Sequence, residues 1–291
     1  MLPAGRLVFT GGIRFLYVLA LMLGNGCVLG SPLSDRYAKL SCAIVRIETT
    51  SGIGTGFFAR SDGLLVTAGH VVYNRTYQKS DGRVTVTATP ISGLKLHFTD
   101  GTTREATIPP ISADDNNNAG VDLAAIRTGI SAPCFIPLSG PGTLSVGDSV
   151  IALGFPASSS SGVLYSGFLS SLALNAVTKV GVIEGTDEIV STTRNLLRVQ
   201  MPITSGASGS PLIADDGTVI GVISEIPIVW TTDLTSLVRK YQTNDSHPQI
   251  LISGFDTNKI LSELAYVVSE FESPGAGLAV PIQYLKTPPV K

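Results

Sequence analysis

Short runs of β-branched residues, each bounded by turn residues, recur along most of the sequence and constrain its fold more than any other feature. Such runs are typical of antiparallel strands, and 31 glycines and 17 prolines supply the tight connections between them. The sequence therefore predicts an all-β protein with little helix. We expect a first barrel from residues 43–49, 56–59, 64–68, 84–89 and 94–98, and a second from residues 149–154, 162–171, 179–183, 196–201, 211–214, 219–224 and 277–280.

The predicted strands are joined by short turns and by one long insertion. Three Asp-Gly dipeptides, at residues 81–82, 100–101 and 216–217, are turn signals between neighbouring antiparallel strands. The insertion covers about residues 226–275 and interrupts the second barrel. Within it, apolar residues recur at helical spacing after a candidate cap at Asp256, which predicts an amphipathic helix packed on the barrel. These apolar residues are Ile260, Leu261, Leu264, Val267, Val268 and Phe271.

The first thirty residues have the composition of an export signal. Arg6 and Arg14 precede the apolar run Phe15–Leu23, which is too short to cross a bilayer comfortably. Cleavage after Gly30 would leave residues 31–291 as an exported protein, periplasmic or secreted, without stable membrane insertion. Two alternatives stay open, namely a lipid anchor at Cys27 and a retained membrane anchor.

The charge of the chain limits the classes of partner that we expect, and its cysteines bear on whether it carries a disulfide. The formal net charge is -2 with 14% charged residues, so there is no basic field to attract nucleic acid, and we expect none as a partner. After signal removal Cys42 and Cys134 remain. In an exported protein these two cysteines either form a disulfide or stay as two buried thiols. In the chain-entropy model such a disulfide would stabilise the folded state by about 4 kcal/mol.

Three short stretches carry residues suited to acyl transfer, and they occur in order along the chain. They are TAGHVV at residues 67–72, VDLAAI at 121–126 and GASGSP at 206–211. A serine hydroxyl needs an imidazole to accept its proton and a carboxylate to orient that imidazole. His70, Asp122 and Ser208 supply one of each. The glycines around the serine permit a tight turn, in which the N–H groups of Gly206 and Ser208 converge on a developing oxyanion.

These stretches resemble the trypsin-like superfamily, and most closely the protease domain of the exported HtrA (Deg) family. The likeness covers about residues 43–281 and includes FTDG at 98–101, LSVGDSVIALGFP at 144–156, GTVIGV at 217–222 and GLAVP at 277–281. The resemblance implies a double barrel of two six-stranded antiparallel β-barrels, about residues 40–130 and 135–285. It implies a serine endopeptidase acting on proteins or peptides, with no metal or cofactor, and a homo-oligomer, trimeric by family analogy.

The resemblance also assigns a role to each site residue. It implies that His70 is the general base, Asp122 its orienting partner and Ser208 the nucleophile, with the backbone of Gly206, Ala207 and Ser208 as the oxyanion hole.

The chain departs from the family pattern in several places. Ser210 replaces the second of two glycines after the nucleophile, and residues 199–204 lack the usual acid. No PDZ domain is expected. With no acidic residue in 199–207, we expect the residue before the cut to be small or apolar rather than Lys or Arg.

Other readings of the same residues are less specific. His97 lies on a predicted strand and His247 in a loop, and neither is a credible metal ligand. Asp114 and Asp115 compete with Asp122 for the third position but lie in an Asn-rich loop. A pseudo-protease acting as a binding module is the main alternative function. An esterase is disfavoured because its Gly-x-Ser-x-Gly elbow joins a strand to a helix.

Overall fold

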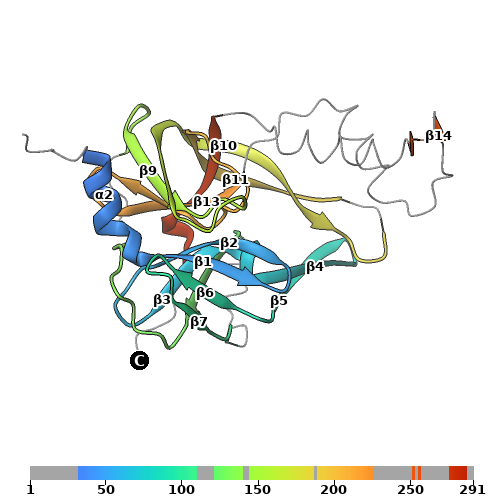
Figure 1. The fold of residues 1–291 in the computed structure, drawn as a ribbon. Helices are drawn as coiled ribbons and strands as arrows, with labels where there is room; N and C mark the ends of the chain where they lie inside the picture. The colour runs from blue at the N-terminus through green and yellow to red at the C-terminus, as the bar shows by residue number, and fades with distance from the viewer. Residues whose placement is uncertain are drawn as a thin grey trace, which may run out of the picture. The chain divides into compact units, whose positions relative to one another are not determined.

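The structure, a computed structural model, describes residues 32–109, 121–139, 144–186, 189–225, 251–252, 255–256 and 275–286 (Figure 1). The chain divides after Arg36 into two units. Of the first, the described part is the start of helix α2 (Pro32–Leu40). The second holds all the strands of the described residues, together with the single turns η1 (Ser41–Ala43), α3 (Gly69–Val72) and η2 (Ile282–Tyr284). The predominance of strands confirms the predicted all-β class.

A six-stranded antiparallel sheet forms the first half of the larger unit. Its strand order is β7-β6-β1-β2-β3-β8. Apolar side chains of this sheet form a buried cluster that includes Ile47, Phe58, Leu65 and Leu96. Successive side chains of a strand point to opposite faces of a sheet, so alternate residues share its inner face. The strands are β1 (Ile44–Thr49), β2 (Gly52–Phe58), β3 (Leu64–Ala68), β6 (Lys95–Phe98), β7 (Thr103–Glu105) and β8 (Leu123–Arg127).

A closed six-stranded barrel forms the second half, in the order β10-β11-β16-β13-β12-β9. Closure leaves no free sheet edge within the barrel, and its interior is filled by a second cluster that includes Val150, Leu169, Val199 and Leu212. The strands are β9 (Ser149–Gly154), β10 (Val163–Val182), β11 (Ile189–Gln200), β12 (Pro211–Ala214), β13 (Val219–Glu225) and β16 (Ala276–Pro281).

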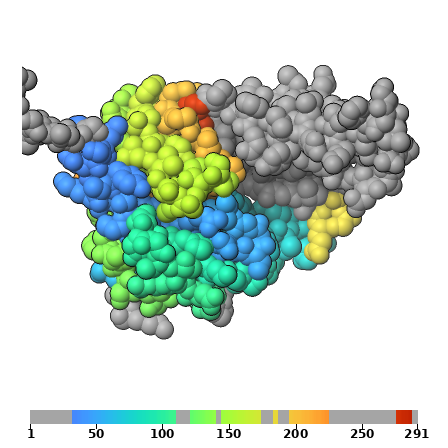
Figure 2. Space-filling model, viewed as in Figure 1, coloured from blue at the N-terminus to red at the C-terminus, as the bar shows by residue number. Residues whose placement is uncertain are grey.

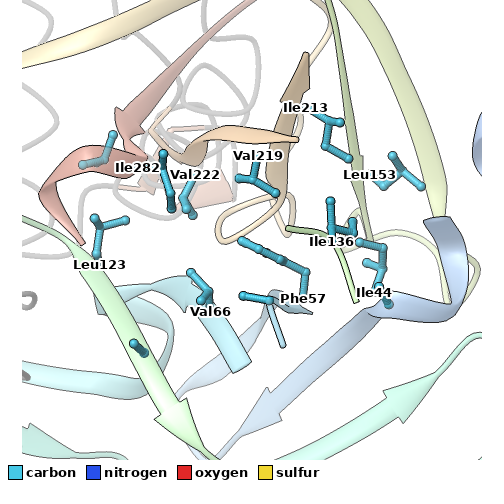
Figure 3. Close-up of a cluster of buried hydrophobic side chains, with 14 of the residues drawn as sticks. Ile44, Phe57, Val66, Leu123, Ile136, Leu153, Ile213, Val219, Val222 and Ile282 are labelled. Carbon is cyan, nitrogen blue, oxygen red and sulfur yellow. The ribbon is translucent and has the colours of Figure 1, made fainter. Parts of the chain in front are cut away.

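A third cluster joins the two halves. It draws side chains from both sheets, and Figure 3 shows Phe57 and Val66 of the first sheet facing Val219 and Val222 of the barrel. In the space-filling view the two halves meet in close contact (Figure 2). A disulfide between Cys42 and Cys134, residues 92 apart in sequence, ties the start of the first sheet to the connection between the halves. Of the two alternatives for these cysteines, the structure has the paired one.

Several details of the strand prediction were wrong. Residues 84–89 belong to β5 (Arg83–Pro90), which pairs with the unpredicted β4 (Tyr73–Ser80) in a separate two-stranded sheet rather than in the first barrel. β4 escaped prediction because most of its side chains are polar and exposed. The runs 162–171 and 179–183 are parts of one long strand, β10. All three Asp-Gly dipeptides do lie in turns that connect antiparallel strands.

The insertion lies mostly outside the described residues. Two short strands, β14 (Leu251–Ile252) and β15 (Phe255–Asp256), pair with each other there. Asp256 is the last residue of β15, and the segment that it was predicted to cap lies outside the described residues. The predicted helix over 260–271 and the predicted signal peptide over 1–30 fall outside the described residues. Among the described residues, no helix is long and apolar enough to span a membrane.

Candidate active site

Strand register brings His70 and Asp122 together. β3 pairs antiparallel with β8, and Ala68 lies opposite Leu123 at the end of the ladder. The next residues of each strand continue the contact, because the Gly69 N–H donates to the Asp122 carbonyl at 3.0 Å. α3 begins at Gly69 and turns His70 toward the carboxylate. The short distance between two residues 52 apart in sequence is thus a consequence of this pairing.

The Asp122 carboxylate accepts hydrogen bonds on both of its oxygens. Oδ1 accepts from the His70 backbone N–H at 2.9 Å and from the Arg75 guanidinium at 2.8 Å. Oδ2 lies 2.9 Å from His70 Nδ1 and accepts from the Ser224 hydroxyl. The Asp122 side chain is buried, at 2% exposure, whereas 40% of the His70 side chain is exposed. A buried acid therefore anchors the ring on its Nδ1 side, and part of the His70 side chain is exposed.

The pKa of Asp122 follows from these contacts. Burial by itself raises the pKa of a carboxyl group. Here the charge and hydrogen bond of His70, the charge of Arg75 and the hydrogen bond from Ser224 outweigh burial, and they hold the pKa of Asp122 well below its usual range. Asp122 is therefore an anion at neutral pH, which is the state that fixes a histidine with its Nδ1 proton toward the acid.

The backbone of Asp122 is left-handed, with a φ of 65°. Few residues other than glycine adopt this region, and Asp and Asn do so most readily. Asp122 therefore suits this position both by its charge and by its backbone, whereas a β-branched residue would be strained.

Ser208 lies in the turn between β11 and β12, the connection within the barrel that faces the first sheet. Its carbonyl accepts from the Thr55 N–H of β2 at 2.8 Å, which fixes the turn against the first sheet. Its hydroxyl donates to the Ser224 carbonyl at 3.4 Å. The hydrogen bonds of the described residues do not include one between Ser208 Oγ and the His70 ring. Ser224 thus contacts both Asp122 and Ser208, through its hydroxyl and its carbonyl.

The turn that holds Ser208 contains the peptide groups that the sequence predicted for the oxyanion hole. Gly206 has a φ of +88°, and a Cβ there would lie 2.5 Å from the Ala157 backbone nitrogen, so only glycine fits. The Ala207 N–H donates to the Thr204 carbonyl at 3.1 Å, in a local turn. Among the described hydrogen bonds none uses the N–H of Gly206 or Ser208. Of the three N–H groups predicted for the oxyanion hole, the Ala207 N–H already has an acceptor within the turn.

Thr55 connects the turn that holds Ser208 to both halves of the fold. It is fully buried, and its hydroxyl donates to the Gly206 carbonyl and accepts from the Phe155 N–H, both at 2.9 Å. Its own carbonyl accepts from the Thr67 hydroxyl at 2.6 Å. Thr55 therefore fixes the peptide that follows Gly206.

The remaining candidates from the sequence lie elsewhere. His97, on β6, bonds Glu48 at 3.2 Å and Thr103 at 2.9 Å on the first sheet. His247, Asp114 and Asp115 lie outside the described residues. Sequence reasoning missed Arg75, Ser224 and Thr55, whose contacts with the site depend on strand packing. No local pattern in the sequence pointed to these three residues.

A two-part β fold with this His–Asp pair beside a serine turn defines the class of the protein as trypsin-like. Residues 54–222, more than half of the chain, match the family described as "Trypsin-like peptidase domain", and the chain belongs to that family. It is 31% identical over 181 residues to "Serine protease HTRA2, mitochondrial" of Drosophila ananassae, and 30% identical to its counterpart in Drosophila virilis. The predicted resemblance to HtrA-type proteases is therefore confirmed.

These curated relatives are much longer than the matched region. The match covers 60% of this chain but only 34% and 35% of the two relatives. Among solved structures, the inactive form of Rv3671c from M. tuberculosis H37Rv has a TM-score of 0.50, 17% identity and 89% coverage of both chains. The HtrA-type protease AlgW with tripeptide has a TM-score of 0.50 and 16% identity, covering 87% of this chain and 60% of its own. At these identities the structures indicate the fold alone.

Proposed function

We propose that this chain is a serine endopeptidase that hydrolyses peptide bonds through an acyl-enzyme formed on Ser208. The observation that carries the proposal is the contact between His70 and Asp122, in which a buried anion holds Nδ1 at 2.9 Å. Membership of the trypsin-like peptidase family supports the same reaction.

The reaction follows from the roles of these groups. His70 Nε2 accepts the proton of Ser208 as its oxygen attacks the substrate carbonyl, and later returns that proton to the leaving amine. Asp122 stabilises the imidazolium that forms in between. The N–H groups of Gly206 and Ser208 stabilise the oxyanion, and each such donor lowers the barrier by about 3 kcal/mol. Water then attacks the acyl-enzyme by the same route in reverse.

Ser208 must turn toward His70 for this to occur. Its hydroxyl donates to the Ser224 carbonyl at 3.4 Å, which is a long and weak hydrogen bond. Rotation about the Cα–Cβ bond releases it, and catalytic hydrogen bonds commonly tighten only when substrate binds. The same contact is the observation that favours the alternative function, a silent pseudo-protease that binds rather than cleaves.

We extend the proposal to substrate and location. The residue before the cut is small or apolar, because residues 199–207 include no acid to pair with Lys or Arg. The protein is exported after cleavage that follows Gly30, and it acts in a periplasm or outside the cell. A homo-oligomer, trimeric by analogy with the family, is part of this proposal.

A peptide-library digest tests the activity and the preference together. The wild-type protein and Ser208→Ala are incubated with a proteome-derived library, and new termini are identified by mass spectrometry. The proposal expects cleavage by wild type alone, mostly after small or apolar residues. Cleavage dominated by Lys or Arg would overturn the preference, and no cleavage beyond that of Ser208→Ala would overturn the endopeptidase.

A further inference from the structure

We propose that Arg75 is a positioning residue for the His70–Asp122 pair: its guanidinium shares the negative charge of Asp122 with His70, so that His70 works as a base at more acidic pH. This inference rests on the proposed function, since it concerns the protonation of the same histidine. It begins from a contact that the three sequence stretches did not predict, the 2.8 Å hydrogen bond from Arg75 to Asp122 Oδ1.

The position of Arg75 on β4 directs its side chain inward. β4 starts directly after α3, and alternate residues of a strand share one face. Tyr73 and Tyr77, two residues before and after Arg75, are 2% and 3% exposed, and the Arg75 side chain is 12% exposed. Asn74 and Thr76, on the opposite face, are exposed. Arg75 therefore shares the inner face of β4 with the two buried tyrosines.

The far end of β4 is held by the barrel. The Glu184 N–H donates to the Tyr77 carbonyl at 2.8 Å, next to a bridge between Tyr77 and Ile183. The Gln78 amide donates to the Glu184 carboxylate at 3.0 Å. In Figure 1 the β4–β5 hairpin and the end of the β10–β11 hairpin lie together. Because both ends of the segment are fixed, Arg75 has little freedom to leave Asp122.

Two basic side chains face the buried carboxylate. Among the described residues, the groups around Asp122 are His70 from α3, Arg75 from β4 and the uncharged Ser224 from β13. Arg75 binds Oδ1 and the His70 ring binds Oδ2, so they act on the two ends of one charge. A guanidinium stays charged throughout the working pH range. It therefore offsets part of the negative charge that would otherwise stabilise protonated His70.

A purely structural ion pair would behave differently. Buried pairs are often retained without adding to stability, and loss of such a pair would misplace Asp122 and slow the reaction equally at every pH. Loss of charge sharing instead leaves Asp122 more negative toward His70, favours the imidazolium and moves the acid side of the pH profile upward. A uniform loss of rate at every pH therefore indicates the structural role, and a shift of the acid side of the pH–rate profile indicates charge sharing.

The experiment measures the rate constant for fluorophosphonate labelling of Ser208 between pH 4 and pH 9, an interval of about five units around the usual pKa of histidine. It compares wild type, Arg75→Gln and Arg75→Lys. For Arg75→Gln we expect the acid-limb midpoint to rise by about 0.5 to 1 pH unit with a plateau within about threefold of wild type. Arg75→Lys, which keeps the charge, should stay close to wild type. A uniform loss at every pH with an unchanged midpoint would overturn the proposal, as would an equal shift in both variants.

An NMR titration of His70 gives a second readout that does not need activity. The three histidines are assigned with His97→Asn and His247→Asn variants of the full chain. Arg75→Gln should raise the titration midpoint of His70 alone, and an unchanged midpoint would overturn the proposal. If wild type fails to label while the His70 midpoint moves as expected, the peptidase proposal fails and the charge-sharing proposal stands.

Discussion

The backbone N–H and the ring Nδ1 of His70 bind different oxygens of Asp122, each at 2.9 Å. Two contacts from one residue to one carboxylate fix the ring in both position and tilt. Strand pairing positions these two hydrogen bonds, because the N–H of Gly69, the residue before His70, donates to the Asp122 carbonyl. The pair is therefore assembled before any substrate arrives.

Replacing Asp122 by Asn should abolish most reactivity of Ser208. An amide leaves the size of the side chain nearly unchanged but favours the wrong histidine tautomer, an effect worth about 10⁴ in rate. The measurement is the rate of fluorophosphonate labelling at pH 7.5, a working value about one unit above the usual histidine pKa. Asp81→Asn is a matched control, because Asp81 also has a left-handed backbone, with a φ of 51°, but lies in an exposed hairpin turn. Equal labelling of Asp122→Asn and wild type would refute the assigned role.

The same substitution should change how stability depends on pH. The pKa of Asp122 lies below its unfolded value, so the folded state binds fewer protons at this site than the unfolded state. Its contribution is therefore present above about pH 5 and is lost as the pH falls through the acid range. Urea unfolding at pH 7, 5, 4 and 3, chosen to bracket an unfolded carboxyl pKa of about 3.9, should give a steeper loss below pH 5 for wild type than for Asp122→Asn. Parallel curves would contradict the lowered pKa.

Thr55→Val should weaken the turn that holds Ser208 while keeping the shape of the side chain. It removes the donor to the Gly206 carbonyl and the acceptor for the Phe155 N–H. Leaving these buried groups without partners costs about 1–3 kcal/mol each, and displacement of the Gly206 peptide should slow labelling about tenfold or more. Thr55→Ser keeps the hydroxyl and is the control. The thermal unfolding midpoint and the labelling rate are measured for both variants. If Thr55→Val equals Thr55→Ser in both quantities, Thr55 does not have this role.

Ser210→Ala should leave the site intact and leave stability unchanged or higher. Ser210 is fully buried, and its hydroxyl has no hydrogen-bond partner among the residues that the structure describes. An unsatisfied buried hydroxyl costs about 1–3 kcal/mol, which alanine would relieve. Urea unfolding and labelling measure both effects, with the neighbouring Ser208→Ala as the variant that folds but does not label. A loss of more than about 1 kcal/mol on Ser210→Ala would mean that the hydroxyl has a partner.

The fold could be predicted from the sequence wherever apolar runs are bounded by turns. β1, β3 and β9 lie where the pattern placed them, because buried apolar side chains follow one another in β3 and β9 and alternate with charged ones in β1. β4 was missed, because its buried residues are two tyrosines and a partly buried arginine among polar neighbours. A strand whose inner face is polar leaves little periodic signal.

Part of the candidate site could likewise be predicted from the sequence, and part could not. His70, Asp122 and Ser208 stand in short stretches whose composition suggested their chemistry, and the structure places His70 in contact with Asp122. The contacts of Arg75 and Ser224 with Asp122 join residues 47 and 102 apart, so they depend on how strands pack and leave no local signal. The disulfide was undecided for the same reason, since pairing requires that two distant Cα atoms come close, here 5.8 Å.

Fluorophosphonate labelling of the intact protein, followed by mass spectrometry of the adduct, tests the central claim most directly. Wild type, Ser208→Ala and His70→Ala are compared after circular dichroism has established that all three are folded. The account predicts one phosphonyl adduct on Ser208 of the wild type and none on either variant. A folded wild type that stays unlabelled, or an adduct on any other residue, would contradict it.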